Sequence, residues 1–313
     1  MHSSIYSVSA IQWTVEDFHC NDGSALNLTS LITTTENNSY ALLAVQEDRL
    51  DSDKLLALFG GSLLQINKQT NSHRIYRLSS DLNSGTHLAF DFVQSNGSTT
   101  VIAADFCLIV FSRNESDCTE WYRIGNCDAD PWADPELMDG DFSVARFGGI
   151  INIELLEDNI VFMADIGSVR KVDFIHRRVD TYRLVPNLED MSINGGFVYT
   201  LRSGPSGQEI TIFSQNTTIA MHTCPSDAPC AEKGVFHKFS AVSPEILLGI
   251  PYGGKSLVLW NLETNAKRPL CEPGVCSVKY LMDMSAVGTT IYIGSVWQAK
   301  DGGGLYDVTF TGI

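Results

Sequence analysis

Alternating apolar and polar residues predict short strands along most of the chain. Between residues 139 and 184 this pattern predicts four strands in series, at Phe147–Ile153, Asn159–Ala164, Val169–Asp173 and Val179–Leu184. The second of these is apolar at most positions, which is typical of a strand covered on both faces. Four antiparallel strands in about 45 residues form one blade of a β-propeller, and one blade alone cannot bury both its faces. We therefore expect the rest of the chain to supply neighbouring blades.

The same alternation recurs in further segments. Five apolar runs, each ending in a small residue and a turn, share one pattern: TVIAADF, NIVFMADIG, GFVYTLRSG, EILLGIPYGG and TIYIGSVW. The predicted blades span residues 31–79, 86–125, 139–185, 186–224, 235–271 and 277–313. The last segment has only three predicted strands, whereas residues 5–13 predict a lone strand. The sequence thus predicts an all-β protein, a single domain over residues 1–313, folded as a six-bladed β-propeller closed by pairing of the N-terminal strand with the last blade.

The segment after residue 138 also resembles a known repeat. It contains Asp139-Gly140, then Ala145-Arg146-Phe147, then the stretch Ala164–Asp173, which reads ADIGSVRKVD. These residues resemble the NHL repeat, which has a DG turn, an ARF-type strand start and a hairpin of this kind. The resemblance implies a propeller fold of the extracellular type. It also implies that Asp165, and Asp105 at the matching place in the preceding blade, cap turns by accepting hydrogen bonds from backbone amides. The alternative is that both are ligands of a metal or substrate near the propeller axis.

The charge balance disfavours two classes of partner. The chain has 37 acidic and 21 basic residues and a net charge of −16, so it repels nucleic acid and anionic lipid. No apolar run reaches the roughly 20 residues of a membrane span. The N-terminus has neither a basic segment nor an apolar segment of the kind found in signal peptides. If the protein is secreted, we expect this sequence to be a mature chain or a fragment.

Five sequons nevertheless indicate secretion. The Asn-X-Ser/Thr motif, the acceptor for N-glycosylation, occurs at Asn27, Asn37, Asn96, Asn114 and Asn216. The last three of these lie at the tips of predicted hairpins, where a bulky glycan can be accommodated. The sequence therefore predicts an N-glycosylated protein that is secreted or lies on the cell surface.

Eight cysteines point to the same compartment. Two local pairs flank short loops that contain proline, Cys224 with Cys230 and Cys271 with Cys276. A third pair, Cys118 with Cys127, brackets a corresponding place, which leaves Cys20 and Cys107 to pair by elimination. An even number of cysteines in recurring positions predicts disulfides formed in an oxidising environment. Zinc binding is the alternative, but no CxxC spacing and no histidine cluster supports it.

The acidic loop over residues 128–141 is the candidate cation site. Calcium prefers six or more oxygen ligands, and Asp128, Asp130 and Asp134 could contribute to such a set. The spacing does not match an EF-hand, so we favour a solvated acidic loop. We accordingly predict no bound cofactor, with calcium as the one candidate.

Aromatic residues provide the candidate interaction sites. Trp132, inside the acidic loop, and Trp297, before a run of three glycines, are expected at the surface and are the best anchors for a partner. Trp121 and Trp260 fall in predicted strands and are expected in the core.

No residues predict catalysis. Known hydrolase motifs are absent, and His87 is the histidine placed near an innermost predicted strand. The sequence therefore favours a non-enzymatic interaction or scaffold propeller, with a protein, a glycan or copies of itself as partner. The alternative is a calcium- or zinc-dependent propeller hydrolase of lactonase type, which would need several ligands converging on the axis.

Overall fold

The computed structural model describes the chain from Leu42 to Thr309, with gaps in several connections; the longest gaps are 78–88, 129–136, 226–235, 272–280 and 296–303. Within the described residues every regular element is a β-strand. The strands form six antiparallel sheets, each made from consecutive strands. This agrees with the prediction of an all-β chain.

The first three sheets cover the N-terminal half of the described chain. The first contains β1 (Leu42–Glu47), β2 (Lys54–Phe59), β3 (Ser62–Asn67) and β4 (His73–Arg77). The second contains β5 (Ala89–Val93), β6 (Thr99–Ala104), β7 (Cys107–Arg113) and β8 (Cys118–Gly125). The third contains β10 (Ile150–Glu157), β11 (Ile160–Asp165), β12 (Ser168–Asp173), β13 (Arg178–Leu184) and the two-residue β9 (Gly140–Asp141), which pairs with β13.

The next three sheets follow in chain order. The fourth contains β14 (Leu188–Asn194), β15 (Phe197–Gly204), β16 (Gly207–Ser214) and β17 (Thr217–Pro225). The fifth contains β18 (Phe236–Ser243), β19 (Ile246–Pro251), β20 (Leu257–Asn261) and β21 (Ala266–Cys271). The sixth has three strands, β22 (Leu281–Val287), β23 (Thr290–Ser295) and β24 (Gly304–Thr309).

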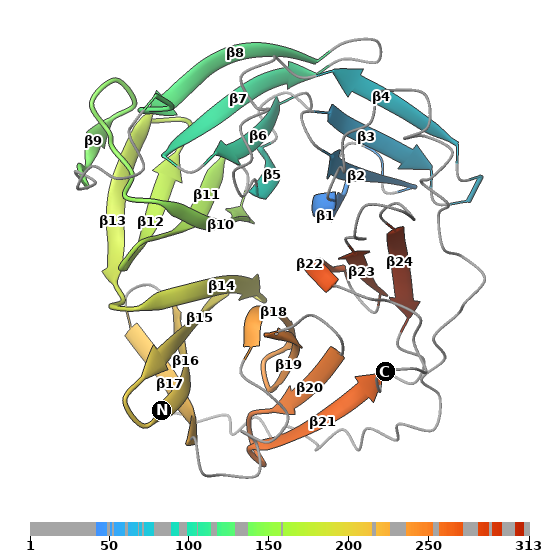
Figure 1. Cartoon of the computed structure of the whole chain (residues 1–313). Coiled ribbons are helices and arrows are strands. Elements are labelled where there is room, and N and C mark those ends of the chain that lie inside the picture. Colours follow the sequence, from blue (N-terminus) through green and yellow to red (C-terminus); the bar gives the residue numbers. More distant parts are fainter. Residues whose placement is uncertain are drawn as a thin grey trace, which may run out of the picture.

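The sheets are arranged around a centre as the blades of a propeller (Figure 1). The first strand of each sheet lies nearest the centre, and β22 of the sixth sheet lies beside β1 of the first. The predicted closing strand at residues 5–13 lies outside the described residues. Five complete blades and a three-stranded sixth sheet are therefore observed, at the places where the sequence predicts them.

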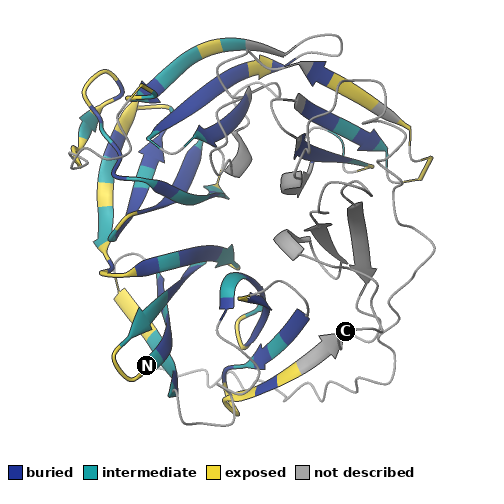
Figure 2. Cartoon of the chain, in the orientation of Figure 1, coloured by how far each residue is buried: buried dark blue, intermediate teal, exposed yellow. Residues whose placement is uncertain are grey.

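Figure 2 marks many residues of the first five sheets as buried, and their side chains form clusters between neighbouring sheets. β11 shows how alternation achieves this. Val161 and Met163 belong to a cluster with residues of the second sheet, whereas Phe162 and Ala164 belong to a cluster with residues of the fourth. Because successive side chains of a strand point to opposite faces, the third sheet packs against both its neighbours.

Bulges recur at the same place in successive blades. In each of the outermost strands β8, β13, β17 and β21, the register shifts by one residue, leaving Trp121, Tyr182, Ile219 and Leu270 as the extra residues. A bulge redirects the side chain of the extra residue. Trp121, in the outermost strand of its blade, is 63% exposed, so the expectation that it lies in the core is wrong. Trp260, which sits in the regular part of β20, is fully buried as expected.

The disulfide pattern differs from the expected one. Cys107 is bonded to Cys127, with 5.0 Å between their Cα atoms, so the predicted pairs of Cys20 with Cys107 and Cys118 with Cys127 are both wrong. The strand register explains the observed pair: Cys107 lies opposite Gly125, whereas Cys118 lies opposite Arg113 at the other end of the hairpin. Cys224 is also disulfide-bonded. Its predicted pairing with Cys230, and that of Cys271 with Cys276, remain predictions.

Candidate functional site

A second set of bulges concentrates polar side chains near the centre of the ring. The register shifts close to the start of β10, β14 and β18, so that Ile151, Glu189 and His237 are the extra residues. The shift recurs at the same place in β1 and β22. In β10, β14 and β18 the residue after the bulge pairs again with the neighbouring strand. These residues are Asn152, Asp190 and Lys238. Equivalent positions of neighbouring innermost strands therefore carry amide, carboxylate, imidazole and ammonium groups. Together with Tyr252, which directly follows β19, we call Asn152, Glu189, Asp190, His237 and Lys238 the axial cluster.

Asp190 is the buried centre of this cluster. Its Oδ1 accepts hydrogen bonds from Asn152 Nδ2 at 3.1 Å and Lys238 Nζ at 3.4 Å, and its Oδ2 accepts one from the Phe239 amide at 2.9 Å. Lys238 Nζ also donates to the Ile151 carbonyl, and Asn152 Nδ2 donates to the Met191 carbonyl. These contacts join three consecutive blades, which share no backbone ladder with each other. Asp190, Asn152 and Lys238 are thus committed to holding the inner strands together.

His237 is held as a neutral ring of defined tautomer. Its Nδ1 lies 3.2 Å from the Pro251 carbonyl oxygen, and since a carbonyl only accepts, Nδ1 carries the proton. Burial lowers the pKa of His237 below its usual value, and the positive charge of Lys238 acts in the same direction. The ring is therefore neutral at pH 7, with its lone pair on Nε2. A neutral imidazole of this kind can accept a proton or a hydrogen bond from a ligand.

Glu189 and Tyr252 complete the cluster. Glu189 is half-buried, and its Oε2 is buried without accepting a hydrogen bond from any described residue. The Tyr252 side chain is 65% exposed, and its ring lies 5.5 Å from the His237 ring. Partial burial raises the pKa of Tyr252, and the negative charge of Glu189 adds to the effect. A carboxylate, a neutral imidazole and a phenol are therefore gathered on two neighbouring blades.

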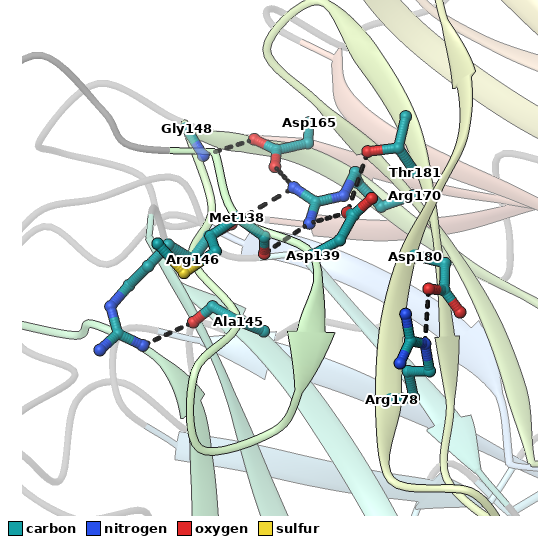
Figure 3. A network of polar contacts seen from close by, with 10 residues as sticks. All are labelled: Met138, Asp139, Ala145, Arg146, Gly148, Asp165, Arg170, Arg178, Asp180 and Thr181. Carbon is teal, nitrogen blue, oxygen red and sulfur yellow. Dashed lines mark hydrogen bonds and ion pairs between the residues drawn. The ribbon is translucent and has the colours of Figure 1, made fainter.

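The residues that carry the repeat resemblance form a separate, structural network (Figure 3). Asp165 is fully buried, and its Oδ1 accepts hydrogen bonds from the amides of Gly148, Gly149 and Ile166 at 2.8–2.9 Å. Its Oδ2 accepts one from Arg170 at 3.1 Å. Burial raises the pKa of Asp165, and the positive charge of Arg170 and the three amides oppose that rise. The turn-capping role expected for Asp165 is therefore confirmed, whereas Asp105 lies outside the described residues.

Arg170 extends this network to the preceding DG turn. Besides Asp165, it donates to Asp139 Oδ1 at 2.8 Å and to the carbonyl oxygens of Met138 and Arg146 at 3.0 and 3.3 Å. Thr181 on β13 also donates to Asp139 (Figure 3). Asp139, in the predicted acidic loop, therefore pairs with an arginine.

Most other predicted site residues lie outside the described residues. This holds for the metal candidates Asp130 and Asp134, for the candidate anchors Trp132 and Trp297, for His87, and for the sequons at Asn27, Asn37, Asn96, Asn114 and Asn216. Asp128 is described and exposed. Among the described residues, no three His, Cys, Asp or Glu side chains are grouped so that they could hold a metal ion, and no helix is long and apolar enough to cross a membrane.

Comparisons with known proteins support the fold alone. No family model and no curated protein matches the sequence. Among solved structures, luciferin-regenerating enzyme superposes with a TM-score of 0.59 at 9% identity, covering 90% of this chain and 94% of that one. U3-55K superposes with a TM-score of 0.53 at 9% identity, covering 88% and 97%. The WD40 β-propeller domain of Doa1 gives 0.52 at 7% identity, covering 88% and 95%. These similarities confirm the predicted β-propeller fold.

Proposed function

We propose that this protein is a non-enzymatic β-propeller that acts outside the cell or on its surface as a binding or scaffold protein. In this proposal the propeller has six blades of NHL type, closed by residues 5–13. Support comes from the sixth sheet, which has three strands where the other sheets have at least four. It also comes from the network of Asp139, Asp165 and Arg170, which gives the repeat-like residues a common structural role.

The extracellular location rests on cysteines and sequons. Cys107 and Cys127 form a disulfide, which is typical of secreted proteins. The sequons at Asn96, Asn114 and Asn216 fall in the short connections between paired strands β5 and β6, β7 and β8, and β16 and β17. Such connections lie at the surface and accommodate glycans.

The axial cluster carries the binding function. Within it, Asn152 and Lys238 are bonded to Asp190 and to the backbone, whereas Glu189 Oε2 accepts no hydrogen bond from a described residue and the Tyr252 ring is exposed. Ligand sites characteristically combine a few convergent polar groups with aromatic surface. The partner is a protein, a glycan or a second copy of the chain.

Secretion and binding can be tested together. We expect the protein produced in eukaryotic cells to be recovered from the medium, with a mass that falls on enzymatic removal of N-glycans. Purified wild type should bind members of a glycan array or of a panel of extracellular proteins, or self-associate in sedimentation. A Glu189→Gln/Tyr252→Ala variant should lose this binding. Retention inside cells without glycans, or binding unchanged in the variant, would contradict the proposal.

A metal-dependent hydrolase is the second candidate function. The neutral His237 ring, at the bulge position next to that of Glu189, favours it because such a ring can act as a general base. Hydrolysis of a panel of lactones and esters, measured with calcium, with zinc and with a chelator, separates the two candidates. Turnover that needs a metal and is lost in His237→Ala would establish the enzyme.

A further inference from the structure

We propose that the axial cluster accepts one basic side chain, a lysine or an arginine, from a partner protein. This inference rests on the proposed binding function and specifies the partner's chemistry. It is carried by Glu189 Oε2 on the fourth sheet, which accepts no hydrogen bond from a described residue, and by the rings of His237 and Tyr252 in and next to the fifth sheet.

The charges of the cluster do not balance. Glu189 and Asp190 contribute two negative charges, Lys238 contributes one positive charge, and His237 is neutral, so one negative charge remains. Lys238 lies 3.4 Å from Asp190, which is fully buried and bonded to Asn152 and to the Phe239 amide. The unbalanced charge therefore belongs to Glu189. A single cation from outside would neutralise it.

Glu189 also lacks hydrogen-bond donors. Its Oε2 is buried and accepts no hydrogen bond from the described residues, although buried carboxylate oxygens are normally bonded. Since the side chain is half-buried, rotation of the carboxylate about its last bond can turn either oxygen to an arriving donor. Ammonium and guanidinium groups supply both the missing donor and the missing charge.

The Tyr252 ring lies within electrostatic range of this carboxylate and beside the His237 ring. The Tyr252 ring is 65% exposed and lies 5.5 Å from the ring of His237, at an angle of 40°. The face of an exposed tyrosine attracts a cation placed within about 6 Å of its centre. The long methylene stem of lysine or arginine can pack along the same ring. Carboxylate and aromatic surface together are thus complementary to a basic side chain.

Other ligands fit less well. One uncommitted carboxylate and one imidazole nitrogen are too few for calcium, which takes six or more oxygen ligands. An anion would be repelled by Glu189, and the net charge of −16 would slow its approach. A glycan would bind without requiring the charge of Glu189, so glycan binding is an outcome that the experiment must separate from cation binding.

The experiment measures binding of small probes by NMR titration of the full chain in low salt. N-acetylarginine amide and N-acetyllysine amide carry the proposed group, and N-acetylcitrulline amide has nearly the shape of the arginine probe without its charge. We expect saturable binding of the two charged probes and at least tenfold weaker binding of the citrulline probe. Glu189→Gln should weaken arginine binding at least tenfold, and Tyr252→Leu about threefold to tenfold, as expected from the loss of a charge pair and of a cation–π contact.

Glu157→Gln is the matched control. Glu157 is an exposed carboxylate at the far end of β10, so its removal changes the net charge equally but leaves the cluster intact. Unchanged binding in Glu157→Gln supports a local site. Equal losses in the two Glu→Gln variants, or equal binding of citrulline, would overturn the inference. If no probe binds while Glu189→Gln/Tyr252→Ala still abolishes glycan binding, the basic side chain is wrong and the proposed binding function stands.

Discussion

Removing Arg170 should destabilise the protein far more than its single charge would suggest. Arg170 and Asp165 are both essentially inaccessible to solvent, and four hydrogen bonds join the guanidinium to Asp165, Asp139 and two carbonyl oxygens. Arg170→Met would leave the Asp165 carboxylate buried without a cation. Breaking a buried pair in this way costs about 3–5 kcal/mol.

Two features place the expected cost at the lower end of that range. The Asp165 carboxylate keeps its three amide donors after the substitution. The buried Nε of Arg170 donates to no described residue, so its removal relieves a small penalty. We therefore expect a loss of about 3 kcal/mol in the free energy of unfolding, measured by urea titration followed by tryptophan fluorescence and circular dichroism.

A double-mutant cycle tests the reasoning directly. Asp165→Ala should lower the free energy of unfolding about as much as Arg170→Met does. It removes the buried carboxylate that pairs with Arg170, and it leaves three backbone amides without their acceptor. The double variant should be more stable, by about 2 kcal/mol, than the sum of the single losses predicts, because no unpaired charge remains. Asp180→Asn is the control: Asp180 pairs with Arg178 at 2.7 Å, but their side chains are 45% and 51% exposed. This substitution should cost less than about 1 kcal/mol. Additive losses, or an Arg170→Met loss no larger than the control's, would refute the reasoning.

Three further predictions concern other parts of the fold. Cys127→Ser removes the disulfide to Cys107, 20 residues away in the sequence, and should lower the free energy of unfolding of the oxidised protein by about 3 kcal/mol. Once dithiothreitol has reduced the wild type and the variant, the two should be equally stable. Equal stability without reductant would contradict this prediction. Burial lowers the pKa of Lys267 to about 8 from an unfolded value of 10.5. The unfolded chain therefore binds more protons between these values, so the free energy of unfolding should rise with pH from about 8 to 10.5, and Lys267→Met should remove that rise relative to wild type. In Gly249→Ala, the new Cβ would lie 2.4 Å from the buried Phe236 ring and should cost about 1–3 kcal/mol, visible as a lower urea midpoint; an unchanged midpoint would exclude the clash.

The strands were predictable from the sequence because local patterns determine them. The alternation of the sequence also predicts strands at Lys54–Phe59 and Ser62–Asn67, and these are observed as β2 and β3. Each is a run of alternating or apolar residues, and the pair Gly60-Gly61 between them indicates a tight hairpin. The strands of the blade with the repeat-like residues are likewise predictable from the sequence, although the first of them begins at Ile150 instead of Phe147. Phe147 instead packs into the cluster between the second and third sheets.

Features that depend on register were missed. The alternation of the sequence predicts a strand that begins at Lys238 and omits His237, because the bulge inserts His237 as an extra residue and interrupts the alternation there. The pairing of Cys107 with Cys127 needs the β7–β8 register, which places Cys118 opposite Arg113. The ten residues from Cys118 to Cys127, eight of them in β8, span far more than the roughly 7 Å that a disulfide can bridge. The sequence itself predicts a strand at Glu120–Ile124, between these cysteines, and that strand is already too long for the two to pair.

In the axial cluster, polar residues that bond the backbone of the next blade have to be distinguished from those that do not before a function is assigned. Neighbouring blades share no backbone ladder, so inner strands need side chains to satisfy the amides and carbonyls that face the next blade. Asp190 does this for the Phe239 amide, Ser192 for the Ala241 amide and Glu154 for the Ile193 amide. These residues have their acceptors in use and are available to a ligand only if the inner strands separate. Glu189 and His237 occupy bulge positions outside this bonding pattern, and for that reason the proposed binding site is assigned to them and to Tyr252 and not to Asp190.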